Sequence, residues 1–377
     1  MAKKLEITLT SDGFSIHTFE LWRNIKRKEM RSIIARLYST ANDGAPQIYP
    51  ARKRKGILFC NQFSEHGIRM ILHAGEGMDN GVHLIINPRK LLDPASGYLG
   101  IMPRDRESFQ LLGENFTDIM RKLCLPEFFD DWNLTTLDFC VNLACSTNKL
   151  PREFIRTAQK TLPPNKYVVQ RFNSNKLPQK KINQINKHYY KLQNDSIAIT
   201  IYDKTYQMRA ESLLVAYEKL PQGVLRAEVR YRSRYIKRAA KKYDLKGTSD
   251  IIFGLATHSR EIMLKHFAAC FPRATFRRPN ELLCLINASE FHMETKEKMT
   301  YLVESLRRKH TVKAALTDTI QRFNMSERAA FELLERFDQI DVSPIPLRKN
   351  FKFDSLTSIP RLFEQLDDEQ TDDIIYR

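Results

Sequence analysis

Apolar and polar residues alternate in several short stretches of the first two thirds of the chain. This two-residue period predicts β-strands over residues 56–63, 69–74, 82–87, 136–143, 196–203 and 224–231. Apolar residues at helical spacing predict helices over residues 18–40, 106–122 and near 151–161. Strands mixed with helices in this way predict an α+β domain over residues 1–245, with an antiparallel β-sheet and flanking helices.

After residue 246 the pattern becomes helical, with helices expected over residues 249–270, 297–310, 312–323 and 326–337. Asn324 and Met325 separate the last two predicted helices, and Ser326 is a residue type that often caps a helix N-terminus. This outline is that of a helix-turn-helix, although such pairs serve packing or dimerisation more often than groove reading. We expect residues 246–345 to form a helical DNA-binding or dimerisation module, and residues 346–377 to form a linker and an acidic tail.

The charge of the chain favours a polyanionic partner. Its 377 residues are 42% hydrophobic and carry a formal net charge of +17, with basic residues spread along the sequence. Such a balance favours DNA as the partner, although some basic proteins are merely soluble. Residues 172–191 are polar, basic and poor in aliphatic side chains, so we expect an exposed, mobile segment that can lie along DNA. Within it, three lysines are expected to contact DNA: Lys180, Lys181 and Lys187.

Several other classes of protein are disfavoured. No stretch approaches the roughly 20 apolar residues of a membrane span, and the lysines near Met1 precede no apolar segment, so we expect a cytoplasmic protein with no membrane contact. The six cysteines lack zinc-binding spacing. No phosphate-binding loop of the GxxxxGK type is present, so a helicase would have to come from the host.

Four of the predicted strands carry polar side chains on one face. Asp138 alternates with apolar residues in its strand, and Tyr202 is followed two residues later by Lys204. If these strands share one sheet, its polar face carries a nucleophile, carboxylates and cations. The set comprises Tyr202 as nucleophile, Lys204 beside it, His83, Asp138 and Glu228 as ligands for a hard cation, and Arg226, Arg230 and Arg232 near phosphate.

Each of these residues also has an ordinary structural interpretation. Glu228 with its neighbouring arginines is typical of a cross-strand lattice of ion pairs, and tyrosines such as Tyr202 commonly pack in strands. His83 fits a satisfied core or surface histidine. Asp138 is the hardest to explain in this way, because an unpaired buried carboxylate is costly, but a bond to a neighbouring loop would also satisfy it.

Four segments in order resemble signatures of the gene II type replication initiators of filamentous phages and of their relatives in small plasmids and integrated elements. The segments are HLIINPRK from His83, TLDFCV from Thr136, ITIYDK from Ile199 and LRAEVR from Leu225. The resemblance covers roughly residues 55–245. It departs from the family at His83, where the family has an acidic residue, and at Thr136 or Leu137, where the family has an arginine. Plasmid rolling-circle initiators and conjugative relaxases are more distantly similar.

The resemblance implies an endonuclease and strand transferase that acts on a double-stranded DNA origin with the help of Mg²⁺ or Mn²⁺. Tyr202 would attack the DNA, form a 5′-phosphotyrosine and leave a free 3′-hydroxyl on the nicked single strand, which a host polymerase extends behind a host helicase. A homodimer is compatible with this role. The alternatives are a conjugative relaxase with the same chemistry and a non-catalytic DNA-binding regulator or origin-binding protein on the same fold.

Overall fold

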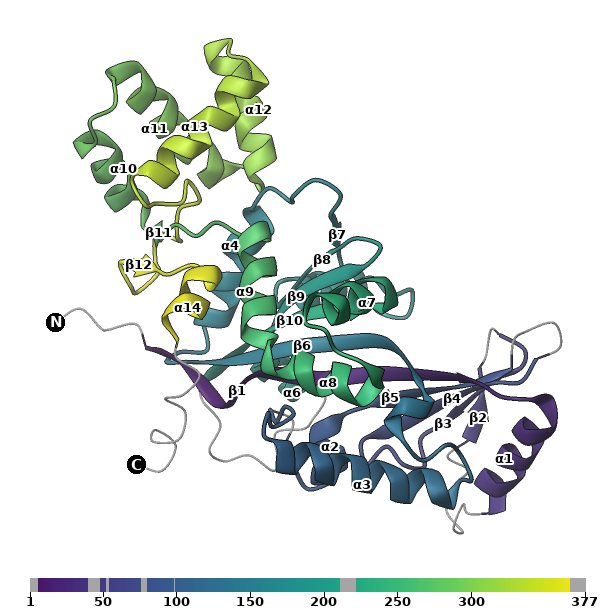
Figure 1. The fold of residues 1–377 in the computed structure, drawn as a ribbon. Coiled ribbons are helices and arrows are strands. Elements are labelled where there is room, and N and C mark those ends of the chain that lie inside the picture. The colour runs from purple at the N-terminus through teal and green to yellow at the C-terminus, as the bar shows by residue number, and fades with distance from the viewer. Residues whose placement is uncertain are drawn as a thin grey trace.

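A large antiparallel sheet forms the centre of the computed structural model (Figure 1), which describes residues 6–39, 48–51, 54–75, 80–97, 99–210 and 222–366. Ten strands follow the order β2-β3-β4-β5-β1-β6-β10-β9-β8-β7. The expected α+β class is therefore confirmed. The strands are β1 (Ile7–Asn24), β2 (Ile48–Pro50), β3 (Ile57–Cys60), β4 (Ile68–His73), β5 (Gly81–Ile86), β6 (Asn133–Cys145), β7 (Val168–Gln170), β8 (Tyr189–Gln193), β9 (Ile197–Asp203) and β10 (Gly223–Arg232).

The long strand β1 corrects one of our predictions. The helix expected over residues 18–40 begins only at Arg27, as α1 (Arg27–Ser39), because β1 continues to Asn24. Phe19 and Leu21 are buried on one face of the sheet and alternate with polar Glu20, which is a strand pattern. Pairing with β5 on one side and β6 on the other therefore decides the conformation of this stretch.

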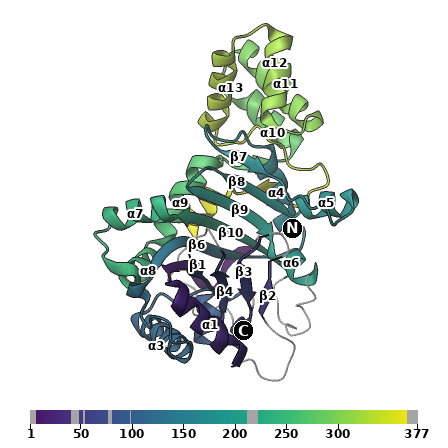
Figure 2. The same cartoon turned by 90° about the vertical axis from the view of Figure 1, so that its right-hand side faces the viewer.

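Helices pack on both sides of the sheet, and several polar side chains of its second face, such as Asp138, Asn142 and Arg226, are buried. Figure 2 shows α7 and α8 on one side of the column of strands and α5 and α6 on the other. Phe139 of β6 packs edge-on against Tyr231 of β10 on the apolar face, at 5.0 Å between ring centroids. The helices of the sheet domain are α2 (Pro88–Leu92), α3 (Arg106–Lys122), α4 (Leu150–Lys160), α5 (Gln179–Asn186), α6 (Lys204–Ala210), α7 (Ser233–Lys242), α8 (Gly247–Thr257) and α9 (Ser259–Cys270), with a short 3-10 helix at Phe129–Asp131.

Residues 172–191 contain more regular structure than expected. Helix α5 and the start of β8 lie within this segment. Ile182 and Tyr190 are buried, and Gln159 donates hydrogen bonds to the Asn186 and Tyr189 carbonyls, while most of the lysines stay exposed. The segment is therefore anchored to the domain and presents most of its charges outward.

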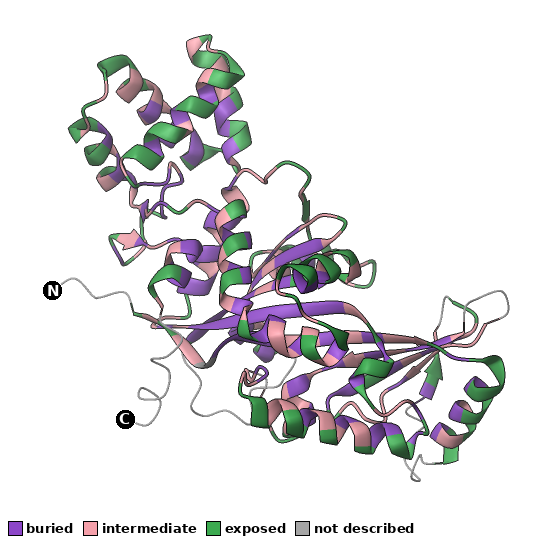
Figure 3. Cartoon of the chain, in the orientation of Figure 1, coloured by how far each residue is buried: buried purple, intermediate pink, exposed green. Residues whose placement is uncertain are grey.

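Four further helices gather beyond the β7 edge of the sheet (Figure 1). They are α10 (Pro279–Ala288), α11 (Met293–Arg308), α12 (Val312–Phe323) and α13 (Glu327–Gln339). The predicted interruption is present: Asn324 ends α12 in the left-handed conformation at φ 47°, and the Ser326 side chain accepts a hydrogen bond from the Ala329 amide. Figure 3 shows buried positions along the inner sides of these helices.

The segment after residue 345 differs from the linker that we expected. Strand β12 (Ser355–Leu356) pairs with β11 (Phe276–Arg277), and α14 (Ile359–Gln365) returns to the sheet domain. There the fully buried ring of Phe363 meets Phe14 and Phe267 edge-on, each at 5.0 Å between centroids. Residues 346–366 thus belong to the packed structure, whereas the acidic run at residues 367–373 lies outside the described residues. None of the helices in the described ranges is both long and apolar enough to cross a bilayer.

Candidate functional site

The register of the sheet brings most of the predicted polar residues onto one face. Strands β6, β10, β9 and β8 are consecutive neighbours. Arg230 lies opposite Asp138 across β10 and β6, and Arg226 lies opposite Tyr202 across β10 and β9. Because side chains alternate along a strand, Glu228 projects from the same face between the two arginines.

Tyr202 and Glu228 form the central contact of this face. The half-buried Tyr202 hydroxyl donates a hydrogen bond of 2.8 Å to Glu228 Oε1. Burial raises the pKa of Tyr202 well above its usual value, and the nearby charge of Glu228 raises it further. Burial also raises the pKa of Glu228, against the opposing effect of Arg226. A phenol that holds its proton tightly is thus bonded to a carboxylate with increased proton affinity.

A cavity of about 430 Å³ opens over this contact. Its floor comes from β8, β9 and β10, and its walls come from the segment around α5 and from α6. Two cationic side chains, Lys191 and Arg230, reach it beside Tyr202. The other lining residues include Phe172, Ile185, His188, Tyr189, Ala198, Thr200, Asp203, Tyr206, Gln207, Ala210 and Glu228.

Lys204 lies close to Tyr202 but is turned into the protein. It is the first residue of α6 and is buried, and its ammonium donates to Gln207 Oε1 at 3.0 Å. The ammonium nitrogen lies 6.0 Å from the centroid of the Tyr202 ring. Its charge can therefore act on the phenol through space.

Two neighbouring side chains bind Asp138. Arg230 Nε and Nη2 donate to its two oxygens at 2.6 Å each, and Thr18 Oγ1 donates to Oδ2 at 2.6 Å. The hydrogen bonds to Asp138 raise the pKa of Arg230. This paired geometry satisfies a carboxylate that is almost fully buried.

His83 lies apart from the other two predicted metal ligands. It is on β5, which is separated by β1 from Asp138 on β6 and by β1 and β6 from Glu228 on β10, with about 4.8 Å per strand spacing. Its Nε2 atom is 3.1 Å from Glu20 Oε2. Burial acts to raise the pKa of Glu20, but the hydrogen bond with His83 and its charge lower it overall. His83 therefore pairs with Glu20 instead of meeting Glu228.

The three predicted ligands do not fit a divalent cation in this arrangement. Asp138 accepts hydrogen bonds from Arg230, and Glu228 accepts a hydrogen bond from the Tyr202 hydroxyl. Among the described residues, no group of three or more histidine, cysteine and acidic side chains is placed to hold a metal ion. A cation could use Asp138 only if Arg230 moved away.

The predicted phosphate-binding residues divide into covered and exposed sets. Arg226 is fully buried, with Nε donating to Asn142 Oδ1 at 2.6 Å and Nη2 to the Leu99 carbonyl at 3.3 Å. We expected Arg226 to contact phosphate, but in this position its side chain is covered. Arg232 is exposed and donates to the Asp195 carbonyl at 3.2 Å. On α5 and at its C-terminal end, the exposed lysines are Lys180, Lys181 and Lys187.

Strand β1 supplies polar residues to this face that our sequence analysis missed. They are Thr18, which binds Asp138, and Glu20, which binds His83. His17 is also on β1, and burial together with the charge of Arg226 lowers its pKa well below the usual value. The alternation of apolar Phe19 and Leu21 with polar residues indicates a strand, but we predicted a helix over this stretch and therefore did not consider which face its polar side chains occupy.

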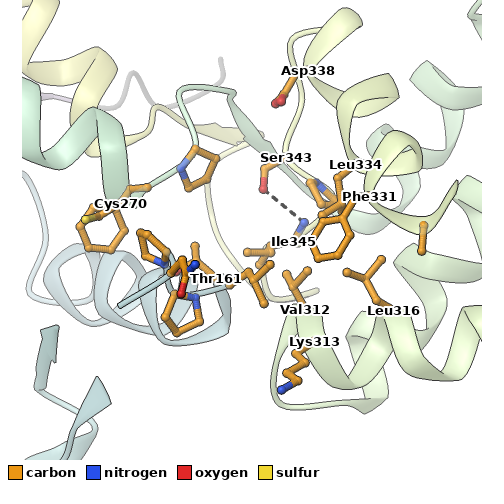
Figure 4. Close-up of a pocket in the computed structure, with 18 of the residues that line it drawn as sticks. Thr161, Cys270, Val312, Lys313, Leu316, Phe331, Leu334, Asp338, Ser343 and Ile345 are labelled. Atoms are coloured by element: carbon orange, nitrogen blue, oxygen red, sulfur yellow. Dashed lines mark hydrogen bonds between the residues drawn. The ribbon is translucent and has the colours of Figure 1, made fainter. Parts of the chain in front are cut away.

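A larger cavity of about 760 Å³ lies between the helical module and the sheet domain (Figure 4). The side chains of Val312, Leu316 and Leu334 give it an apolar wall, and the Ile345 amide donates to the Ser343 hydroxyl at 3.3 Å. No nucleophile paired with a base faces this space among its described lining residues. The smaller cavity at Tyr202 is therefore the stronger candidate for chemistry.

The fold and the site define an α+β protein with a tyrosine–carboxylate pair in a cation-lined cavity. Comparison with models of known protein families found no match, and comparison with curated proteins found none either.

Proposed function

We propose that this protein initiates rolling-circle replication by nicking one strand of a DNA origin with Tyr202. The observation that carries the proposal is the hydrogen bond from the Tyr202 hydroxyl to Glu228, in a cavity lined by Lys191 and Arg230. A phenol with a bonded base and adjacent cations is the arrangement that nucleophilic attack on a phosphodiester requires.

The reaction can be written with this chain's own residues. Glu228 takes the phenolic proton as the Tyr202 oxygen attacks phosphorus, and the bond from phosphorus to the 3′-oxygen breaks. The products are a 5′-phosphotyrosine and a 3′-hydroxyl, which takes its proton from water, and Glu228 then releases the phenolic proton to the solvent, so that no net proton is gained or lost. Lys191 and Arg230 offset the negative charge that builds up on the phosphate oxygens. Arg226 is a positioning residue, because it is buried on the same face of the sheet, directly across from Tyr202.

The four segments that resemble gene II type initiators support this proposal by their position. They fall on β5 and the start of α2, on β6, on β9 and on β10. These strands belong to one sheet, and the last three are adjacent in it. The partners implied are a double-stranded origin, the nicked single strand, a host polymerase that extends the 3′-end and a host helicase. We include the helical module α10–α13 as an origin-binding or dimerisation unit.

A nicking assay on supercoiled plasmid that carries the element's own origin tests the proposal. We expect open circles with protein attached to the 5′-end, loss of nicking in Tyr202→Phe and retention in Tyr49→Phe, which changes an exposed tyrosine of β2 outside the cavity. Parallel reactions with Mg²⁺, Mn²⁺ and a chelator test the metal dependence that the resemblance implies. Nicking by Tyr202→Phe at the wild-type rate would overturn the assignment of the nucleophile.

A DNA-binding regulator without catalytic activity is the second candidate. The observation that favours it is that Asp138 is fully engaged by Arg230 and Thr18, as in a purely structural lattice of ion pairs. Such a protein would bind origin DNA and leave the plasmid supercoiled with every divalent ion tested. The same assay therefore separates the two functions, whereas a conjugative relaxase would nick at a transfer origin by the same chemistry.

A further inference from the structure

The walls of the cavity at Tyr202 are aromatic, and the nicking chemistry does not use them. The Tyr206 ring stacks on the His188 imidazole, with centroids 3.8 Å apart and planes inclined by only 6°. Phe172 and Tyr189 also line the cavity. Four flat side chains thus surround a space whose floor carries cations.

Hydrogen bonds hold these flat walls in place. His188 Nδ1 is 2.9 Å from Asp203 Oδ2, and Asp203 Oδ1 accepts the Tyr206 amide at 2.9 Å. The Phe172 amide donates to Asn186 Oδ1 at 2.8 Å, and the Asn186 side-chain amide donates to the Phe172 carbonyl at 3.0 Å. The aromatic walls are therefore built before any ligand binds, which lowers the entropic cost of binding.

The size and the charge of the cavity select the ligand. Its volume of about 430 Å³ lies in the range of roughly 300–1,000 Å³ that is usual for pockets holding one small molecule. Lys191 and Arg230 attract phosphate, while aromatic rings bind the faces of nucleobases by stacking. In a duplex those faces are covered by neighbouring base pairs, so only an unpaired base can enter.

We propose that this cavity holds one unpaired nucleobase of the strand that Tyr202 cleaves, stacked against the Tyr206–His188 pair. The inference rests on the proposed function and specifies its substrate: DNA that is single-stranded at the scissile phosphate. The phosphate next to the bound base lies over Lys191 and Arg230, which brings it within reach of Tyr202.

Binding of labelled oligonucleotides, followed by fluorescence anisotropy, tests the proposal without any cleavage. The probes are an oligothymidylate of about ten nucleotides, a fully abasic strand of the same length and a duplex of that length. We expect the wild type to prefer the thymidylate to the abasic strand and to the duplex. Tyr206→Leu should weaken thymidylate binding roughly 5- to 150-fold with little change for the abasic strand, and Tyr206→Phe should keep the preference because it retains the ring.

Two further variants keep the test decisive. Phe172→Leu removes another aromatic ring from the lining of the cavity, and its effect on thymidylate binding tests the proposal if Tyr206→Leu lowers the melting temperature. Tyr49→Leu changes an exposed tyrosine of β2, 46% accessible, and should leave binding unchanged. Equal binding of thymidylate and abasic strands by the wild type would overturn the proposal. If the base preference is present but no plasmid is nicked, the proposed function fails and the base site stands.

Discussion

The Arg230 guanidinium donates one hydrogen bond of 2.6 Å to each oxygen of the Asp138 carboxylate, from β10 to the neighbouring β6. The two partners differ in burial, because the Asp138 side chain is 5% exposed and that of Arg230 is 45% exposed. Loss of the arginine would leave a buried charge with one hydroxyl partner, whereas loss of the carboxylate would leave a cation that water can reach.

This asymmetry predicts a rank order of stability. Arg230→Ala should lower the free energy of unfolding by about 2–4 kcal/mol, and Asp138→Asn by about 1–2 kcal/mol, since one side of the pair is solvated. Thr18→Val should cost about 1 kcal/mol. Urea denaturation measures all three, and an Asp138→Asn variant less stable than Arg230→Ala would contradict the interpretation.

The Tyr202–Glu228 pair predicts a pH-dependent nicking rate. Glu228 must be ionised to accept the proton, so nicking should fall as the pH drops through its raised pKa, at a higher pH than for an ordinary glutamate. Glu228→Gln should slow nicking by roughly 10²- to 10⁴-fold and remove this acid limb. Single-turnover rates across a pH series measure both effects. Exposed Glu65→Gln is the matched control, and an unchanged acid limb in Glu228→Gln would exclude Glu228 as the base.

His266 predicts a loss of stability in acid. Burial lowers its pKa to about 4, and its Nε2 lies 2.6 Å from the Tyr231 hydroxyl on the apolar face of the sheet. The unfolded chain takes up this proton near its ordinary pKa of 6.5, so the native state loses stability as the pH falls from there towards about 4. The loss should be about 3 kcal/mol for this residue. Because His17 acts in the same direction, the quantity to compare is the difference between wild type and His266→Gln, and parallel pH profiles would refute the prediction.

The exposed lysines of α5 predict a change in the salt dependence of DNA binding. If Lys181 touches a phosphate, Lys181→Ala should weaken duplex binding and reduce the slope of log affinity against log salt by about 0.9. Lys28→Ala, on α1 at the opposite end of the sheet from β7, serves as the control. Identical slopes for the wild type and Lys181→Ala would show that α5 does not lie along the DNA.

Elements with strong local signals could be predicted from the sequence. Helix α3 begins and ends where expected because Asp105 caps its first turn, through a 2.6 Å bond from the Ser108 amide, and its apolar residues recur at helical spacing. The turn at Asn324 was predictable for a similar reason. The end of the chain was not predicted, because Pro344 and Pro346 favoured a linker. Ile359, Leu362 and Phe363 nevertheless recur at helical spacing in α14, and the Phe363 ring packs against Phe14 and Phe267.

The sequence by itself determined which side of each strand is polar, because alternation along a strand is a local property of the backbone. Asp138, Tyr202 and Glu228 could be assigned to one kind of face for that reason. Which of these side chains meet depends on strand order and register, which arise from contacts between residues far apart in the chain. The tertiary structure alone therefore joined Tyr202 to Glu228 and Arg230 to Asp138, and it paired His83 with Glu20 instead.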